Sequence, residues 1–151
     1  DQEKTVVDPG MPFRTAFLHH MQRLGLPVVA EPFEHFGQAV SNASQMAALV
    51  ARLPVQAKVS DLVSRTLGLE KLIVAADYDA RLYTAGVIGS IALASGQCEG
   101  KGSTTGQLFR FTFQHQLQFP GWHQLFSQNA ALMDRGAANA WSIGQHARLA
   151  V

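Results

Sequence analysis

The residues best suited to catalysis are the single cysteine and a short acidic segment. Cys98 lies in the segment GQCEGKG, where a thiolate nucleophile would need a histidine from elsewhere in the fold as its base. Asp77 precedes Arg81 by four residues, so the two side chains pair if this segment is helical. His115, which stands among phenylalanines, is a further candidate. A hydrolase that uses Cys98 or Asp77 with a histidine is therefore one hypothesis, although GQCEGKG matches no catalytic signature.

Metal-binding and nucleotide-binding patterns are absent from the sequence. No two of the 6 histidines lie four residues apart, as in metal-binding helices, and no HExxH motif occurs. A single cysteine excludes a cysteine-based zinc cluster and an intramolecular disulfide. The glycine-rich segment 96–106 contains Lys101, but its spacing departs from that of a Walker loop. We therefore expect no metal and no cofactor.

The charge balance restricts the class of partner. The chain of 151 residues has a formal net charge of +1, and charged residues, 15% of the total, are spread along it with both signs mixed. Such a chain offers no basic patch for a nucleic-acid backbone and no polybasic segment for anionic lipid. We expect the partner to be another protein or a second copy of the chain, with no nucleic acid and with a membrane not favoured.

One apolar stretch, Leu82–Cys98, lacks charged side chains and is rich in small residues such as Gly86, Gly89 and Ser90. Small residues spaced by four on a helix let a neighbouring helix approach closely. The stretch reaches only the lower limit of a membrane span, ~17 residues. We interpret it as the central helix of a soluble bundle. The alternative is a pore-forming toxin whose Leu82–Gly96 helix is sheltered in the soluble form and later enters a membrane.

Helical periodicity places these residues on elements. Apolar residues three or four apart, with glycine or proline at the ends, predict helices at 13–24, at about 33–53 and from Ser60 as N-cap. The same pattern predicts one long helix at about 69–95, ended by Gly96. The next segment, 96–106, contains four glycines and is the predicted mobile loop.

The pattern of residues 108–119 is ambiguous. Large apolar residues alternate with polar ones, which is typical of a strand. A lone strand would leave its backbone groups unpaired, and no other segment offers a comparable partner strand. We therefore favour a helix, with a strand as the alternative. A further helix is predicted from Trp122 to Gly136, followed by a short one that carries Trp141.

These elements predict an all-α fold. Residues 11–151 are expected to form a single domain, a compact bundle of roughly five to seven helices around the small-residue-rich helix at about 69–95. Residues 1–10 are expected to be a flexible tail or a remnant of cloning. The expected location is the cytoplasm, or outside the cell after export without a visible Sec signal peptide.

The composition favours action by binding over catalysis. The leading hypothesis is a non-catalytic, bacterial-type interaction or adaptor module that acts through an apolar surface. Its binding and packing residues would be Phe109, Phe113 and Trp122, together with Gly86, Gly89 and Ser90, where a neighbouring helix can approach the central helix closely. The alternatives are the pore-forming toxin and the hydrolase. The residues do not suggest membership of a known family.

Overall fold

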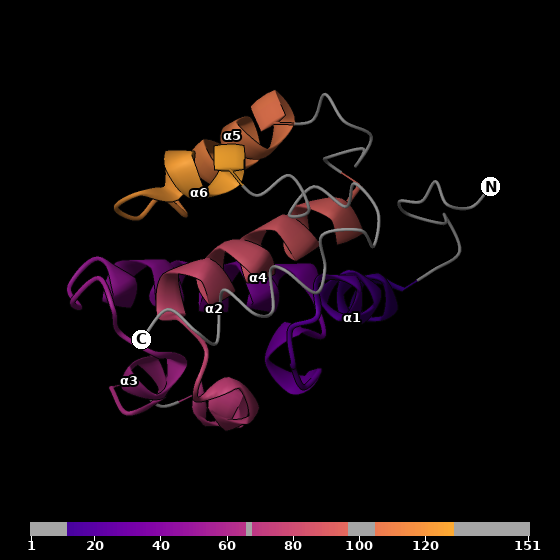
Figure 1. Ribbon diagram of the computed structural model, residues 1–151. Helices are drawn as coiled ribbons and strands as arrows, with labels where there is room; N and C mark the ends of the chain where they lie inside the picture. Colours follow the sequence, from indigo (N-terminus) through magenta and orange to yellow (C-terminus); the bar gives the residue numbers. More distant parts are fainter. Residues whose placement is uncertain (1–11, 66–67, 97–104, 129–151) are drawn as a thin grey trace.

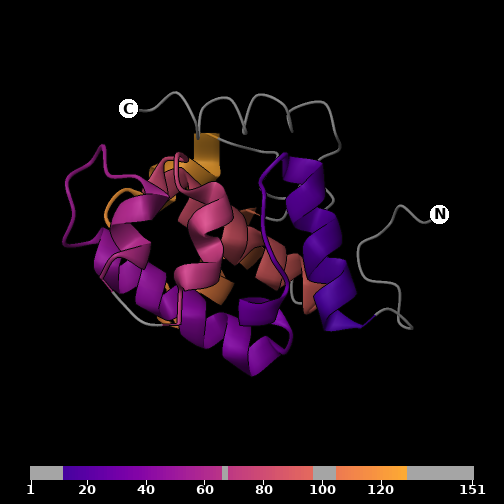
Figure 2. The ribbon, with the colours of Figure 1, turned by 90° about the horizontal axis from the view of Figure 1, so that it is seen from below.

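The computed structural model describes residues 12–65, 68–96 and 105–128, and within these ranges the protein is all-α, without strands. Helix α4 runs through the middle of the molecule, with α5 and α6 on one side and α3 on the other (Figure 1). Helices α1 and α2 pack along α4 (Figures 1 and 2). In chain order the elements are α1 (Phe13–Leu24), η2 (Glu31–Phe33), α2 (Phe36–Val50), α3 (Val59–Val63), η3 (Glu70–Ala75), α4 (Ala80–Ala94), α5 (Thr105–Gln114) and α6 (Trp122–Gln128).

Helix α1 has the bounds that the sequence predicts. Its apolar residues, such as Phe17 and Met21, are fully buried and face the core. The helix ends in a Schellman motif, in which Gly25 is left-handed with φ 77°. The Gly25 N–H donates to the Gln22 carbonyl at 3.0 Å, and the Leu26 N–H donates to the Met21 carbonyl at 3.1 Å.

The predicted helix at 33–53 is divided into η2 and α2. His35, between them, has the extended conformation φ −126°, ψ 150°, so a continuous helix is impossible there. The separate turn of η2 stacks Phe33 on Phe17 of α1, with ring centroids 4.7 Å apart. Side-chain amides of α2 donate to carbonyl groups of η2 and hold the turn against the helix.

Helix α3 begins slightly before the predicted N-cap, Ser60, so that prediction is wrong. The N-cap is Lys58, whose backbone N–H donates to the Asp61 carboxylate at 2.9 Å. The Val59 N–H donates to the Tyr78 carbonyl at 2.8 Å, which joins α3 to the segment before α4. An acidic residue in the first turn and a tertiary hydrogen bond thus set this helix start.

The prediction of one helix at about 69–95 is also wrong, because η3 and α4 are separate. Asp79 lies between them in an extended conformation, φ −60° and ψ 128°, and its side chain accepts the Leu82 N–H at 2.8 Å. The Ala80 N–H donates to the Ala57 carbonyl at 2.9 Å. These bonds use backbone groups that a continuous helix would need, so the central helix is α4 alone.

All residues of α4 except Arg81 are buried, as is typical of a helix that is apolar on every side. The Tyr83 hydroxyl donates to the Pro27 carbonyl at 2.7 Å and so links α4 to the chain after α1. Gly96 has φ 83° and follows the helix end, as predicted. Among the helices of the described ranges, none combines the length and the apolar character needed to span a membrane.

Residues 108–119 begin as a helix, α5, so the strand alternative is wrong for the part that α5 covers. The helix ends sooner than predicted because it closes in the same motif as α1. The Leu117 N–H donates to the Thr112 carbonyl at 2.9 Å, and the Gln116 N–H donates to the Phe113 carbonyl at 3.2 Å. Gln116 has φ 58° and takes the left-handed position that Gly25 occupies after α1.

Helix α6 begins at Trp122, as predicted. The turn before it is held to α4, because the Arg81 Nη1 donates to the Pro120 carbonyl at 2.9 Å. The later part of the helix predicted to reach Gly136, and the short helix with Trp141, lie outside the described residues. The same is true of the predicted tail, 1–10, and of residues 97–104 of the predicted loop. The loop prediction is wrong for Thr105 and Gly106, which form the start of α5.

The two Schellman motifs yield a matched test of backbone strain. We expect Gln116→Gly to raise the free energy of unfolding by about 1 kcal/mol, because glycine adopts the left-handed conformation without the penalty that a Cβ imposes. Gly25→Gln should lower it by a similar amount. Urea unfolding followed by circular dichroism measures both, and shifts of the same sign would contradict this account of the helix ends.

The cap of α4 yields a second test. Burial raises the pKa of the Asp79 carboxyl above 3.8, although backbone N–H groups oppose this. Because the folded-state pKa lies above the unfolded value, the contribution of this carboxyl to stability is complete below pH ~3.8 and is lost as the pH rises through the folded-state pKa. Asp79→Asn keeps the cap without the buried charge, so at pH 7 it should be at least as stable as the original protein.

The advantage of Asp79→Asn should vanish below pH ~3.8, where the carboxyl is protonated in both states. Asp79→Ala removes the cap and should cost about 1 kcal/mol at either pH. Denaturant unfolding at pH 7 and pH 3.5 makes the comparison. An asparagine variant as unstable as the alanine variant at pH 7 would be inconsistent with a cap that tolerates the neutral amide.

Candidate functional site

Helices α5 and α6 lie together on the side of α4 away from α3 (Figure 1), and their aromatic side chains pack against one another. The Phe109 ring centroid lies 5.1 Å from that of Trp122, 5.2 Å from that of His123 and 6.4 Å from that of Phe126. Trp122 and Phe126 are buried, whereas Phe109 is half-buried and His123 is exposed. The cluster therefore runs from the core to the protein surface.

Phe113 is an exposed aromatic residue of the helix that carries Phe109. It lies one helical turn after Phe109, on the same side of α5, and it is 69% exposed. The opposite side of α5 faces the core, where Leu108 and Phe111 are buried. We call Phe109, Phe113 and His123, supported by the buried Trp122, the α5–α6 aromatic surface. The structure thus brings Phe109 and Trp122 together and leaves Phe113 exposed, one helical turn after Phe109.

The small residues singled out in the sequence lie within α4. Gly86, Gly89 and Ser90 are all buried, in the helix that packs against α1 and α2. The Ser90 hydroxyl has no hydrogen-bond partner in the structure. These residues therefore lie in the interior and do not contribute to an exposed surface.

Of the residues considered for catalysis, the structure describes Asp77 and His115 and shows no contact between them. Asp77 is exposed in the turn before α4. His115 packs between the rings of Phe36 and Phe111, with centroids 5.7 Å and 4.6 Å away. Cys98 lies outside the described residues. Within the part of the chain that the structure describes, no group of three or more histidine, cysteine, aspartate or glutamate side chains could hold a metal ion.

A second surface feature, which the sequence patterns did not indicate, is a polar hollow of about 370 Å³ between η2, α2 and the start of η3. We call it the η2–η3 hollow. Its side chains come from two separate segments, so no local spacing could have predicted it. The residues that line it are Glu31, Pro32, Gln38, Ser41, Asn42, Gly68, Glu70 and Lys71.

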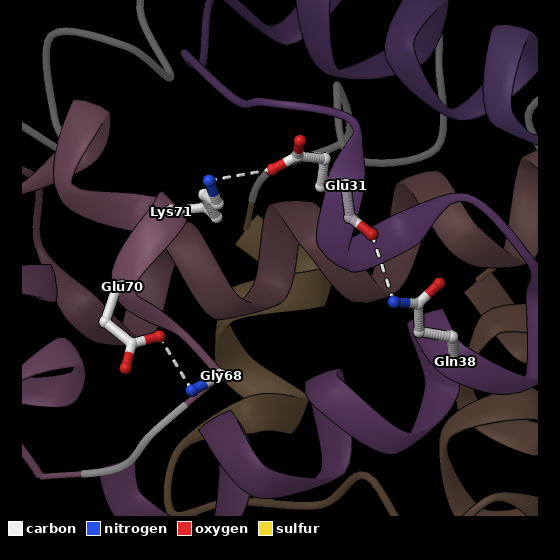
Figure 3. A network of polar contacts seen from close by, with 5 residues as sticks. All are labelled: Glu31, Gln38, Gly68, Glu70 and Lys71. Atoms are coloured by element: carbon white, nitrogen blue, oxygen red, sulfur yellow. Dashed lines mark hydrogen bonds and ion pairs between the residues drawn. The ribbon is translucent and has the colours of Figure 1, made fainter.

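Figure 3 shows the polar contacts around this hollow. The Lys71 Nζ lies 3.1 Å from the Glu31 Oε1, which forms an ion pair between η3 and η2. The Gln38 Nε2 donates to the Glu31 carbonyl at 3.0 Å. The Gly68 N–H donates to the Glu70 Oε1 at 2.7 Å. These contacts keep both carboxylates at the rim of the hollow.

Two buried ionisable groups outside these surfaces have shifted pKa values. Burial, with smaller contributions from His19 and Arg23, lowers the pKa of His20 from 6.5 to about 4. Burial also raises the pKa of Tyr83, whose hydroxyl is bound to a backbone carbonyl. Both groups are therefore uncharged near neutral pH, and we assign them to the stability of the core.

Comparisons of the chain with protein-family models, with curated proteins and with solved structures each give no match.

The buried histidine gives a test of acid stability. His20 has a folded-state pKa below its unfolded value, so its contribution to stability is complete above pH 6.5 and is lost as the pH falls toward about 4. We expect the free energy of unfolding to fall by about 2–3 kcal/mol between pH 7.5 and pH 4.5 from this group alone. His20→Leu should remove this part of the fall.

His19→Gln is the matched control, because it changes the exposed neighbour on the same helix. His19→Gln should lose nearly as much stability between pH 7.5 and pH 4.5 as the unaltered protein does. Urea unfolding at the two pH values supplies the comparison. If the loss between pH 7.5 and pH 4.5 is the same in His20→Leu as in the unaltered protein, the buried histidine is not its source.

Proposed function

We propose that the protein is a non-catalytic binding module that docks another protein, or a second copy of itself, through the α5–α6 aromatic surface. The observation that supports this most directly is the 69% exposure of Phe113. Beside it, Phe109 is held by contacts with Trp122 and Phe126. Exposed aromatic side chains next to a packed aromatic cluster are typical of protein interfaces.

The expected energetics agree with a role in binding. Full burial of a phenylalanine side chain stabilises a complex by roughly 1.5–3 kcal/mol, which corresponds to a change in Kd of about tenfold to a hundredfold. Because Phe113 is largely exposed in the folded chain, its side chain contributes little to the core. Its removal should therefore affect a complex far more than the fold.

The neighbouring residues bear on the chemistry of the partner. Gln114 carries no charge and is exposed, while Arg110, one turn earlier, is exposed and positively charged. A partner surface with an apolar pocket and an acidic rim would complement this arrangement. Rim charges mainly affect the association rate and the specificity, so the apolar contact at Phe113 is expected to dominate affinity.

The catalytic alternative has less support from the geometry. An acid or nucleophile and its base must lie within hydrogen-bond reach, directly or through one water molecule. Asp77 is exposed in the turn before α4, whereas His115 packs on Phe36 and Phe111. These two candidates therefore do not form a pair in this fold.

The decisive variant for the proposed function is Phe113→Ser. We expect it to leave the free energy of unfolding within about 0.5 kcal/mol of the original value, since the side chain is exposed. It should weaken the complex at least tenfold. Sedimentation velocity across a concentration series measures self-association. A photoreactive phenylalanine analogue at position 113, used in the cells that make the protein, captures a different partner by cross-linking.

Val55→Ser is the matched control, because Val55 is a comparably exposed apolar residue, at 65%, in the loop before α3. It should leave self-association and the position-113 cross-links unchanged. The proposal fails if position 113 yields the same cross-links as position 55 while Phe113→Ser and Val55→Ser have equal effects on self-association.

A further inference from the structure

We propose that the η2–η3 hollow binds the head group of an organic cation, an alkylguanidinium or alkylammonium ion. This site is separate from the α5–α6 aromatic surface, because the described residues that line it belong to η2, α2 and the chain at the start of η3. The inference therefore does not depend on the proposed docking function. Three properties of the hollow support it: its charge, the direction of its hydrogen bonds and its size.

The charge of the hollow favours a cation. Two carboxylates, Glu31 and Glu70, line it together with one ammonium group, Lys71. Its formal charge is therefore −1, from two negative groups and one positive group. The ion pair between Lys71 and Glu31 joins the Lys71 Nζ to the Glu31 Oε1 at 3.1 Å. Lys71 thus acts as an internal ammonium ligand, and among the described residues of the lining no second cation balances the charge of Glu70.

The hydrogen bonds within the hollow leave acceptor oxygens for a ligand, beside the second N–H of each side-chain amide and the other N–H groups of Lys71. The amide nitrogen of Gln38 is bound to the Glu31 carbonyl, and that of Asn42 is bound to the Pro32 carbonyl at 2.7 Å. Because the oxygen and nitrogen of a planar amide diverge, each side-chain oxygen is directed away from that carbonyl. The Gly68 N–H is bound to Glu70 in the same way. A ligand with several N–H donors complements the acceptor oxygens.

The size of the hollow suits one small head group. Its volume of about 370 Å³ lies at the low end of ligand sites, which span roughly 300–1,000 Å³. The described residues contain no group of three or more possible metal ligands among histidine, cysteine, aspartate and glutamate. An organic cation that shares its charge among several hydrogen bonds is therefore a better fit than a bare metal ion.

The test is an NMR titration of the full chain with methylguanidinium and with the blocked amino acid N-acetyl-arginine amide. Amide shifts of Gly68 and of the α2 residues that line the hollow report binding. Glu70→Gln should weaken binding about two- to fivefold, the usual effect of one exposed ion pair. Lys71→Met should strengthen it by a similar factor, because it removes the internal competitor. Binding should weaken as sodium chloride is raised from 20 to 300 mM.

Glu34→Gln is the control, because Glu34 is also an exposed glutamate in an ion pair, 3.9 Å from Arg14, and does not line the hollow. It should change the Kd by less than twofold. Stronger binding of the blocked arginine than of methylguanidinium assigns the site to a side chain of a protein partner, and equal binding assigns it to free small cations. The proposal is overturned if neither cation shifts these amides, or if Lys71→Met abolishes binding, as it would at an anion site.

Discussion

The burial of α4 is the constraint on which the rest of the structure depends. Its side chains are apolar or small on all sides, and only Arg81 reaches solvent in part. A helix of this kind must be surrounded, so α1 and α2 pack along it and α5 and α6 cover another side (Figure 1). The small residues Gly86, Gly89 and Ser90 lie inside this arrangement. Without the covering helices, α4 would expose a large apolar surface to water, which is unfavourable in free energy.

The connections to α4 are polar, and they fix its position more specifically than apolar packing alone. Its start is capped by Asp79 and joined to the chain before α3. Arg81 holds the turn before α6, and Tyr83 holds the chain after α1. Each partner is a backbone carbonyl or N–H far away in sequence or at a helix end. The bonds of Asp79 and Tyr83 are buried or partly buried and would be costly to break, because an unpaired buried polar group loses its interaction with water. They therefore specify one arrangement of the helices.

The sequence predicts the helices well where local signals agree with tertiary contacts. The bounds of α1 follow from apolar spacing and Gly25, and the end of α4 follows from Gly96. The errors occur where a tertiary bond overrides helical periodicity. Asp79 interrupts the predicted long helix because its junction pairs with the chain before α3. Gln116 ends α5 in a conformation that is normally taken by glycine, so the residue type at this position did not predict the end of the helix.

The same contrast applies to the candidate sites: part of one could be predicted from the sequence, and the other could not. Phe109 and Trp122 could be singled out because aromatic residues are dense in that part of the sequence, but the 69% exposure of Phe113 depends on how α5 is rotated on the core. The η2–η3 hollow has no sequence signal at all. It exists because η2 is folded against α2 and because Lys71 reaches Glu31 from a segment remote in sequence. Ordinary surface residues become a site only through this tertiary contact.

The central claim is that α4 is the buried core element around which the protein folds and from which its binding surfaces are presented. Native-state hydrogen exchange of the α4 amides tests this most directly. The account predicts that amides in the middle of α4, from Gly86 to Ile91, exchange only through global unfolding, with the same free energy as denaturant unfolding. Exchange of these amides through local opening, at a free energy well below that of α1 and α2, would contradict it.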